Sequence, residues 1–214
     1  GIFENCAALL YPDGTVEVLT SRLEEETAKA AQAKITVFEK KEERNEILKD
    51  RLQNVKRIGI NSTELTHSNF TTLKQLARRA KFIDISEAVM NTRVVKEEKE
   101  IKDIKEAATI ASEVFEDIVD SIDIGIKEYE LASEISYKLG KKGSSGIAFD
   151  TIVAFGDNTA EPHYSSGDRA LRKGDFIVMD FGARFNMYCS DITRTLIMGK
   201  ATKKQRKIYD TVLE

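Results

Sequence analysis

Two aspartates near the end of the chain have a residue type and a spacing that suit chemistry. Asp180 ends an apolar run in the segment MDFGARFNMYCSDITRT, residues 179–195, and Asp191 lies further along the same segment. A tight turn at Phe185-Asn186, where asparagine tolerates the turn conformation, would fold this segment into a β-hairpin. In that register Asp180 lies directly opposite Asp191, with the two Cβ atoms roughly 4.5–5.5 Å apart on one face.

Two like charges at this separation destabilise a hairpin unless something compensates them. Carboxylate oxygens are hard ligands that accept Mn²⁺, Mg²⁺, Co²⁺ or Zn²⁺, and each carboxylate can also bridge to a second ion. Two ions about 3.5–4 Å apart would generate hydroxide near neutral pH and polarise a carbonyl, which suits the hydrolysis of an amide. The aspartate pair therefore predicts a hydrolytic metal centre.

A structural role for the same aspartates fits the pairing geometry equally well. Asp191 could cap the turn region or pair with Arg184 or Arg194, while Asp180 lies at a hydrated strand end. A register slip of one residue would also turn one aspartate to the other face. Geometry alone leaves both interpretations open.

The two histidines of the chain differ in their surroundings. His163 lies in the loop segment AEPHYSSGDR, where an imidazole over the aspartate face could donate to a substrate carbonyl or a developing oxyanion. A surface histidine with no role fits this position equally well. His67 lies at a predicted helix start and is expected to be structural or exposed.

The elements before the aspartates indicate two domains. Residues 1–88 alternate strand and helix patterns, with a hairpin signal at Asp13-Gly14 and a helix over 21–33 that has Ser21 as its N-cap, so we expect an α/β domain. Residues 89–214 begin with one long amphipathic helix over 91–122. Its apolar stripe contains Ile101, Ile104, Ala108, Ala111, Phe115, Ile118 and Ile122.

The rest of the second domain is predicted to be α+β with a mainly antiparallel sheet. A second helix ends at Gly140, and the following GKKGSSG lacks the GxxxxGK[ST] order of a phosphate-binding loop. The predicted strands are FDTIVAFG, DFIVMDFGA and YCSDITRTLIMG.

Composition limits the classes of partner and compartment. The chain has 214 residues, 41% hydrophobic and 32% charged, with a net charge of −3 and no basic block, so neither nucleic-acid binding nor a membrane span is expected. Two distant cysteines and no signal-peptide pattern favour a reducing cytoplasm. Both ends look cut, because Gly1 precedes a strand closely and the last helical pattern has no stop signal.

Three segments resemble the pita-bread metallopeptidases, and within them the Xaa-Pro peptidases prolidase and aminopeptidase P. They are TRVVKEEKEIKDIKEAATIA, GDNTAEPHY and LRKGDFIVMDFGARFNMYCSDITRT. Residues 1–86 resemble, more weakly, the amino-terminal domain of creatinase and prolidase relatives. The resemblance implies a creatinase-like α/β domain followed by the first half of a pita-bread catalytic domain.

The same resemblance implies the roles of the candidate residues. Asp180 and Asp191 become ligands of a dinuclear site, filled by Mn²⁺ or Co²⁺ first and by Zn²⁺ or Fe²⁺ as alternatives, and His163 stabilises the transition state. The substrate is a peptide or dipeptide with proline in second position, and a homodimer is expected. The family's other ligands, a histidine and two glutamates, lie outside this chain, so the fragment alone is expected to be inactive.

Other members of the fold offer alternative interpretations. Methionine aminopeptidase usually lacks the amino-terminal domain, and creatinase resembles a metal-free site in which these aspartates are not kept. A non-catalytic relative that binds peptides or proteins is the competing class. The presence of Asp180, Asp191 and His163 together favours the enzyme.

Overall fold

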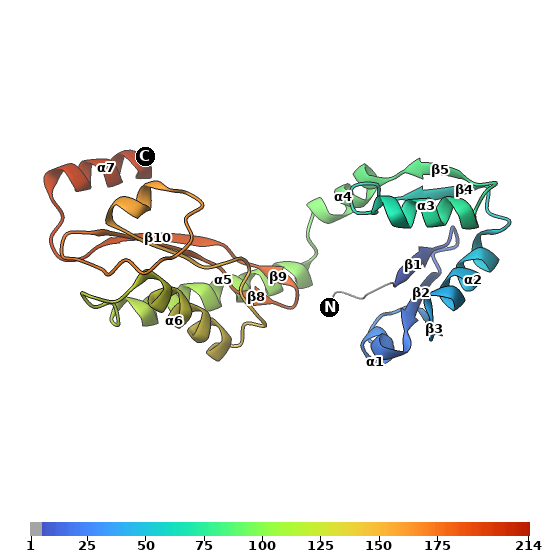
Figure 1. The fold of residues 1–214 in the computed structure, drawn as a ribbon, viewed down its shortest axis with the longest axis horizontal. Helices are drawn as coiled ribbons and strands as arrows, with labels where there is room; N and C mark the ends of the chain where they lie inside the picture. Colours follow the sequence, from blue (N-terminus) through green and yellow to red (C-terminus); the bar gives the residue numbers. More distant parts are fainter. Residues whose placement is uncertain (1–5) are drawn as a thin grey trace. The chain divides into compact units, whose positions relative to one another are not determined.

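A computed structural model describes residues 6–214, and contacts divide the chain into two compact units, Gly1–Val95 and Lys96–Glu214. Figure 1 follows the chain through both units. The sequence placed the domain boundary after residue 88, and the division at Val95 assigns the whole of helix α4, Ser86–Val94, to the first unit.

The first unit alternates strands and helices as predicted. The predicted hairpin forms between β1 and β2, which are antiparallel, and Gly14 adopts a φ of 85° in its turn. Strand β3 pairs in parallel with β2, and β4 pairs in parallel with β5. Its elements are β1 (Ala7–Leu10), β2 (Val16–Ser21), α1 (Glu25–Ala28), β3 (Lys34–Phe38), α2 (Lys41–Leu52), β4 (Arg57–Ile60), α3 (His67–Leu76), β5 (Lys81–Asp84) and α4.

The predicted helix over 21–33 is much shorter than expected. A 3₁₀ turn at Arg22–Glu24 leads into α1, which ends at Ala28. The Ser21 side chain accepts no capping hydrogen bond, and Ala28 is the buried residue of this short helix. Short helices need an apolar face that packs on neighbours, and this segment offers too little of one.

The long helix predicted over 91–122 is two helices, α4 and α5 (Glu98–Val119). Glu97 has extended backbone and forms a capping box with Glu100, which starts α5 afresh. The predicted stripe is buried at Ala111 and Ile118, but its first member, Ile101, is 43% exposed. The buried apolar side chains of α5 are Ala107, Ile110, Ala111, Val114 and Ile118.

In the second unit, α5 and α6 (Glu128–Lys141) cover one face of an antiparallel sheet, which confirms the predicted fold class (Figure 1). Helix α6 continues past Gly140, and Gly143, with a φ of 96°, follows its end. The strand order is β10-β7-β6. The strands are β6 (Ile152–Phe155), β7 (Phe176–Phe181), β8 (Arg184–Phe185), β9 (Tyr188–Cys189) and β10 (Ile192–Ile197).

Alternation along β7 separates its two faces. Ile177, Met179 and Phe181 are buried in the core beneath α5 and α6. Val178 and Asp180 therefore point to the opposite face, where both are half-buried. Helix α7 (Lys203–Leu213) packs on this second face at the far end of the strand. No helix in residues 6–214 has an apolar stretch long enough for a bilayer.

Candidate active site

The hairpin that carries the two aspartates turns at Asn186-Met187, one residue later than predicted. Both residues have positive φ, 46° and 71°, as a two-residue type I′ turn requires. As a result Asp180 pairs with Thr193 across β7 and β10. The prediction that Asp191 lies directly opposite Asp180 is therefore wrong.

The observed register nevertheless keeps the two aspartates on one face. Moving the turn by one residue moves the cross-strand partner by two, and side chains in a strand alternate with a period of two. Asp191, two residues before Thr193, becomes the diagonal neighbour of Asp180. The Thr193 hydroxyl donates a hydrogen bond of 2.9 Å to Asp180 Oδ1 across the strand pair.

The direction of the pKa shift of Asp180 reflects its burial and the proximity of Asp191. Burial raises the pKa of Asp180 above its ordinary value, the hydrogen bond from Thr193 lowers it, and the nearby carboxylate of Asp191 raises it further. Asp191 itself is exposed. The pair is thus an electronegative position, half covered by protein and open to solvent, where a cation would relieve the repulsion.

The described residues do not support the alternative in which an arginine neutralises Asp191. Between residues 6 and 214 neither Arg184 nor Arg194 makes an ion pair with Asp191. The Arg194 guanidinium instead lies 5.7 Å from the ring centroid of Phe115 and donates to the Thr193 carbonyl at 2.9 Å. In the part of the chain that the structure describes, no basic side chain forms an ion pair with either aspartate.

The chain before Asp191 is held by a close backbone approach. Strand pairing pauses between Phe181 and Arg184, where Gly182 faces the Ser190 carbonyl so closely that a Cβ at position 182 would overlap it. Ser190 is buried, and its hydroxyl accepts a hydrogen bond of 3.0 Å from the Ala183 amide. These contacts fix the path of the backbone into Asp191.

The hairpin tip is anchored to the first turns of α5. The Tyr188 hydroxyl donates to Glu100 Oε1 at 2.6 Å, and the Asn186 side-chain amide donates to Asp103 Oδ1 at 3.1 Å. These two contacts link the strand register to a helix that is packed on the other face of the sheet. Sequence reasoning did not identify them, because the partners are more than 80 residues apart.

His163 lies in the segment 156–175 between β6 and β7, which we call the His163 loop. Its side chain is exposed, and among the described residues no hydrogen bond or ion pair joins it to Asp180 or Asp191. His67 begins α3 and is also exposed, as expected.

Sequence reasoning missed Glu128, a fully buried carboxylate that binds the His163 loop. An acid in the first turn of a helix is typically exposed to solvent, so no feature of the sequence marked Glu128.

The two aspartates fit part of a divalent-metal site. Their oxygens are the hard donors that such ions prefer, and they lie on one face. Within residues 6–214 no group of three or more histidine, cysteine or acidic side chains could hold a metal ion. The described residues therefore offer two ligands of a set that normally needs at least four.

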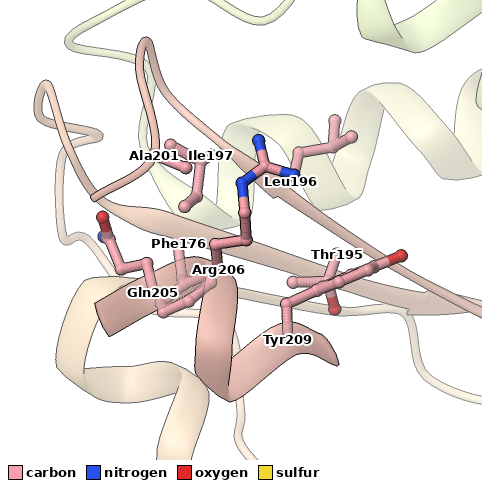
Figure 2. Close-up of a pocket in the computed structure, with 8 residues that line it drawn as sticks. All are labelled: Phe176, Thr195, Leu196, Ile197, Ala201, Gln205, Arg206 and Tyr209. Carbon is pink, nitrogen blue, oxygen red and sulfur yellow. The ribbon is translucent and has the colours of Figure 1, made fainter. Parts of the chain in front are cut away.

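A cavity of about 260 Å³ lies between α7 and the sheet, on the face that carries Asp180 (Figure 2). Figure 2 shows Tyr209 beside Thr195, and Arg206 extending from α7 towards Leu196. Neither aspartate lines this cavity. A second cavity, of about 770 Å³, reaches Thr193, which hydrogen-bonds Asp180.

Comparison with known proteins assigns a family to each of the two units. Residues 2–95 match the creatinase/prolidase N-terminal domain, and residues 102–214 match metallopeptidase family M24. The chain is 36% identical over 193 residues to the Xaa-Pro dipeptidase of Pyrococcus furiosus, which covers 90% of this chain and 54% of that protein. It is 36% identical over 167 residues to a putative dipeptidase of Bacillus subtilis, covering 78% and 46%.

Solved structures give the same result for the fold. The prolidase from Pyrococcus horikoshii aligns with a TM-score of 0.89 at 33% identity, covering 97% of this chain and 58% of that one. The X-Pro aminopeptidase from Thermotoga maritima aligns with a TM-score of 0.87 at 32% identity, covering 94% and 58%. The chain spans about half the length of the curated relatives it matches. Because the M24 match covers more than half of its residues, the chain belongs to metallopeptidase family M24, with a creatinase/prolidase-type domain in front.

Proposed function

We propose that the complete protein is a metal-dependent exopeptidase that hydrolyses the bond between an amino-terminal residue and a following proline. The observation that carries this proposal is the Asp180/Asp191 pair, which lies on one face of the sheet without a basic partner in the described residues. The relatives support the substrate class, because the curated match in P. furiosus is an Xaa-Pro dipeptidase.

In this proposal Asp180 and Asp191 would hold two divalent ions, which when bound would supply an activated water and polarise the scissile carbonyl. Thr193 orients Asp180 by the hydrogen bond at Oδ1, which leaves the second oxygen of the carboxylate for a cation. His163 donates a hydrogen bond to the developing oxyanion from its loop. Mn²⁺ or Co²⁺ is preferred, with Zn²⁺ or Fe²⁺ as alternatives.

Further expectations belong to the same proposal. The 214-residue chain by itself holds metal weakly and is inactive, since its described residues offer two ligands of the set. The protein acts in the cytoplasm as a homodimer, and its substrates are dipeptides or longer peptides with proline in second position. These expectations follow from the resemblance to prolidase and aminopeptidase P.

The first test removes the metal and one ligand. With the complete protein loaded with Mn²⁺, we expect chelator to abolish Xaa-Pro hydrolysis and Asp191→Asn to lower kcat/KM by more than about 100-fold, because loss of a ligand exceeds the usual effect of its supporting groups. Turnover and bound Mn²⁺ are measured together. Asp210→Asn, at an exposed position in α7, is the matched control. Full turnover in chelator, or in Asp191→Asn, would contradict the proposal.

The second test separates His163 from the metal ligands. His163→Ala should lower kcat by about 100-fold or more while bound Mn²⁺ stays unchanged, as expected for a donor to the transition state. His67→Ala, at the other histidine, should change neither quantity. A loss of Mn²⁺ in His163→Ala would instead make His163 a metal ligand.

A further inference from the structure

A buried carboxylate lies beneath the His163 loop. Glu128, in the first turn of α6, is 0% exposed, and none of the basic side chains in residues 6–214 makes an ion pair with it. A buried charge without an ion pair is costly unless hydrogen bonds satisfy it. The hydrogen-bond donors around Glu128 therefore indicate its role.

Four donors surround the two carboxylate oxygens. Oε1 accepts from the Phe155 amide at 2.8 Å and from the Asn158 side-chain amide at 2.9 Å. Oε2 accepts from the Tyr164 hydroxyl at 2.8 Å and from the Gly167 amide at 3.0 Å. Phe155 ends β6, and the other three donors lie in the His163 loop, on both sides of His163. One carboxylate thus fixes the loop at points before and after the histidine.

Further contacts tighten the same junction. The Asn158 amide also donates to the Tyr164 hydroxyl at 2.7 Å, so the two loop donors are linked to each other. The Tyr129 amide donates to the Gly167 carbonyl at 3.1 Å, and the Glu128 amide donates to the Arg169 carbonyl at 3.2 Å. The start of α6 therefore binds the loop through side chain and backbone together.

Tyr164 is the point at which this junction acts on His163. The two residues are neighbours in the chain, and Tyr164 turns inward to Glu128 while His163 is exposed. The hydrogen bond to Glu128 raises the pKa of Tyr164, in keeping with a hydroxyl that donates to a carboxylate. Because the loop backbone is held on either side of position 163, the imidazole starts from a restricted position rather than from a free loop.

We propose that Glu128, acting through Tyr164, is a positioning residue for His163. This inference rests on the proposed function only for the role of His163. The junction itself is a property of the fold. Without it the loop keeps its sequence but loses the fixed approach of the imidazole, and kcat falls while the binding of substrate and metal does not.

Two variants weaken the junction to different degrees. Glu128→Gln keeps the shape but turns one oxygen into an amide NH₂ group, which faces two donors and leaves them unsatisfied. Tyr164→Phe removes one hydroxyl with little change in volume and tests the idea even if Glu128→Gln fails to fold. Tyr137→Phe is the matched control, because Tyr137 lies on the same helix and is 66% exposed.

The experiment compares these variants in the complete protein loaded with Mn²⁺. We expect Tyr164→Phe to lower kcat about 10-fold or more, with KM and bound Mn²⁺ within about twofold, because small misplacements of a catalytic group are costly. In the His163→Ala background the same change should lower kcat no further, since the two residues act as one unit. A full additional loss in that background, or no loss in the wild type, overturns the proposal.

Hydrogen exchange provides a readout that does not depend on turnover. Amides of residues 156–171 should exchange faster in Tyr164→Phe and Glu128→Gln, while those of α5 and β7 stay protected. Unchanged exchange in the loop overturns the junction whether or not the enzyme turns over. Absence of Xaa-Pro hydrolysis in the wild type, with faster loop exchange in the variants, counts against the proposed function and leaves the junction standing.

Discussion

At the scale of single residues, the position of Asp191 depends on Gly182, which lies between β7 and β8. Gly182 has no side chain, and this lets the Ser190 carbonyl approach its Cα face. Asp191 follows Ser190 directly, so any group larger than hydrogen at position 182 must displace the backbone that carries the carboxylate. A residue without functional groups thereby contributes to the geometry of the candidate metal centre.

Gly182→Ala should therefore destabilise the chain by about 1–3 kcal/mol, the usual cost of overpacking, because the overlap involves backbone rather than a flexible side chain. Urea unfolding of the 214-residue chain measures the change. Gly140→Ala is the matched control, since a Cβ there meets no atom and the helix favours alanine by up to about 1 kcal/mol. If both substitutions changed the free energy of unfolding equally, the close approach of Gly182 to Ser190 would not contribute to stability.

Residue-level prediction from the sequence succeeded where chemistry is local. The types and spacing of Asp180 and Asp191 pointed to a shared face, and the structure brings them to one face in a register that differs from the predicted one. Their role as metal ligands stays a prediction, as does that of His163. Glu128 was missed because its importance comes from four donors that only the folded chain brings together.

At the scale of elements, the tip of the β8-β9 hairpin sets the register of the candidate site. Asn186 occupies a left-handed conformation that most side chains avoid, and its amide reaches Asp103 in α5. The sequence correctly indicated that Asn186 belongs to the turn. It did not show whether Asn186 is the first or the second turn residue, and this difference moves every cross-strand partner by two positions.

Asn186→Ala and Asn186→Gly separate the two contributions of this residue. Asn186→Ala loses the hydrogen bond and strains the turn, so we expect a loss of about 1–3 kcal/mol in the free energy of unfolding. Asn186→Gly loses only the hydrogen bond and should cost about 1 kcal/mol or less. Thermal unfolding of both variants checks the order. If Asn186→Gly were the more damaging, backbone strain would not be the dominant effect.

Predictions for whole elements failed where a helix has to begin or end. The break between α4 and α5 depends on a capping box at Glu97 and Glu100, and the continuous apolar periodicity concealed it. The core face of α5 includes Ile110 and Val114, which were not in the predicted stripe, whereas the predicted Ile101 is exposed. Strands with clear alternation, such as β7, were found correctly.

At the scale of the whole molecule, each unit has its own core and its own buried acid. In the first unit Glu17, with a side chain 2% exposed, accepts from Tyr11 at 2.8 Å, Thr36 at 2.6 Å and Arg51 Nε at 3.1 Å. Burial acts to raise the pKa of Glu17, but the hydrogen bonds from Arg51, Thr36 and Tyr11 outweigh it and lower the pKa from 4.5 to about 2.

This lowered pKa makes the first unit sensitive to acid. A carboxyl whose folded pKa is depressed stabilises the fold above its unfolded pKa, and the contribution is lost as the pH falls from about 5 towards 2. The loss is on the order of 3 kcal/mol. Urea unfolding at pH 7 and pH 3 should show a steep loss in the wild type and a flatter one in Glu17→Gln. The exposed Glu42→Gln is the control, and equal slopes for all three proteins would refute the assignment.

Each of the two units contains one histidine, which can serve as a spectroscopic probe of that unit. The two imidazoles of the sequence fall one to each side of Val95, His67 in α3 and His163 in its loop. Their ring-proton resonances in an NMR spectrum can therefore be told apart with one substitution and no isotope labelling. If a ligand, an acid titration or a mutation affects only one unit, the histidine resonance that changes its chemical shift will identify that unit.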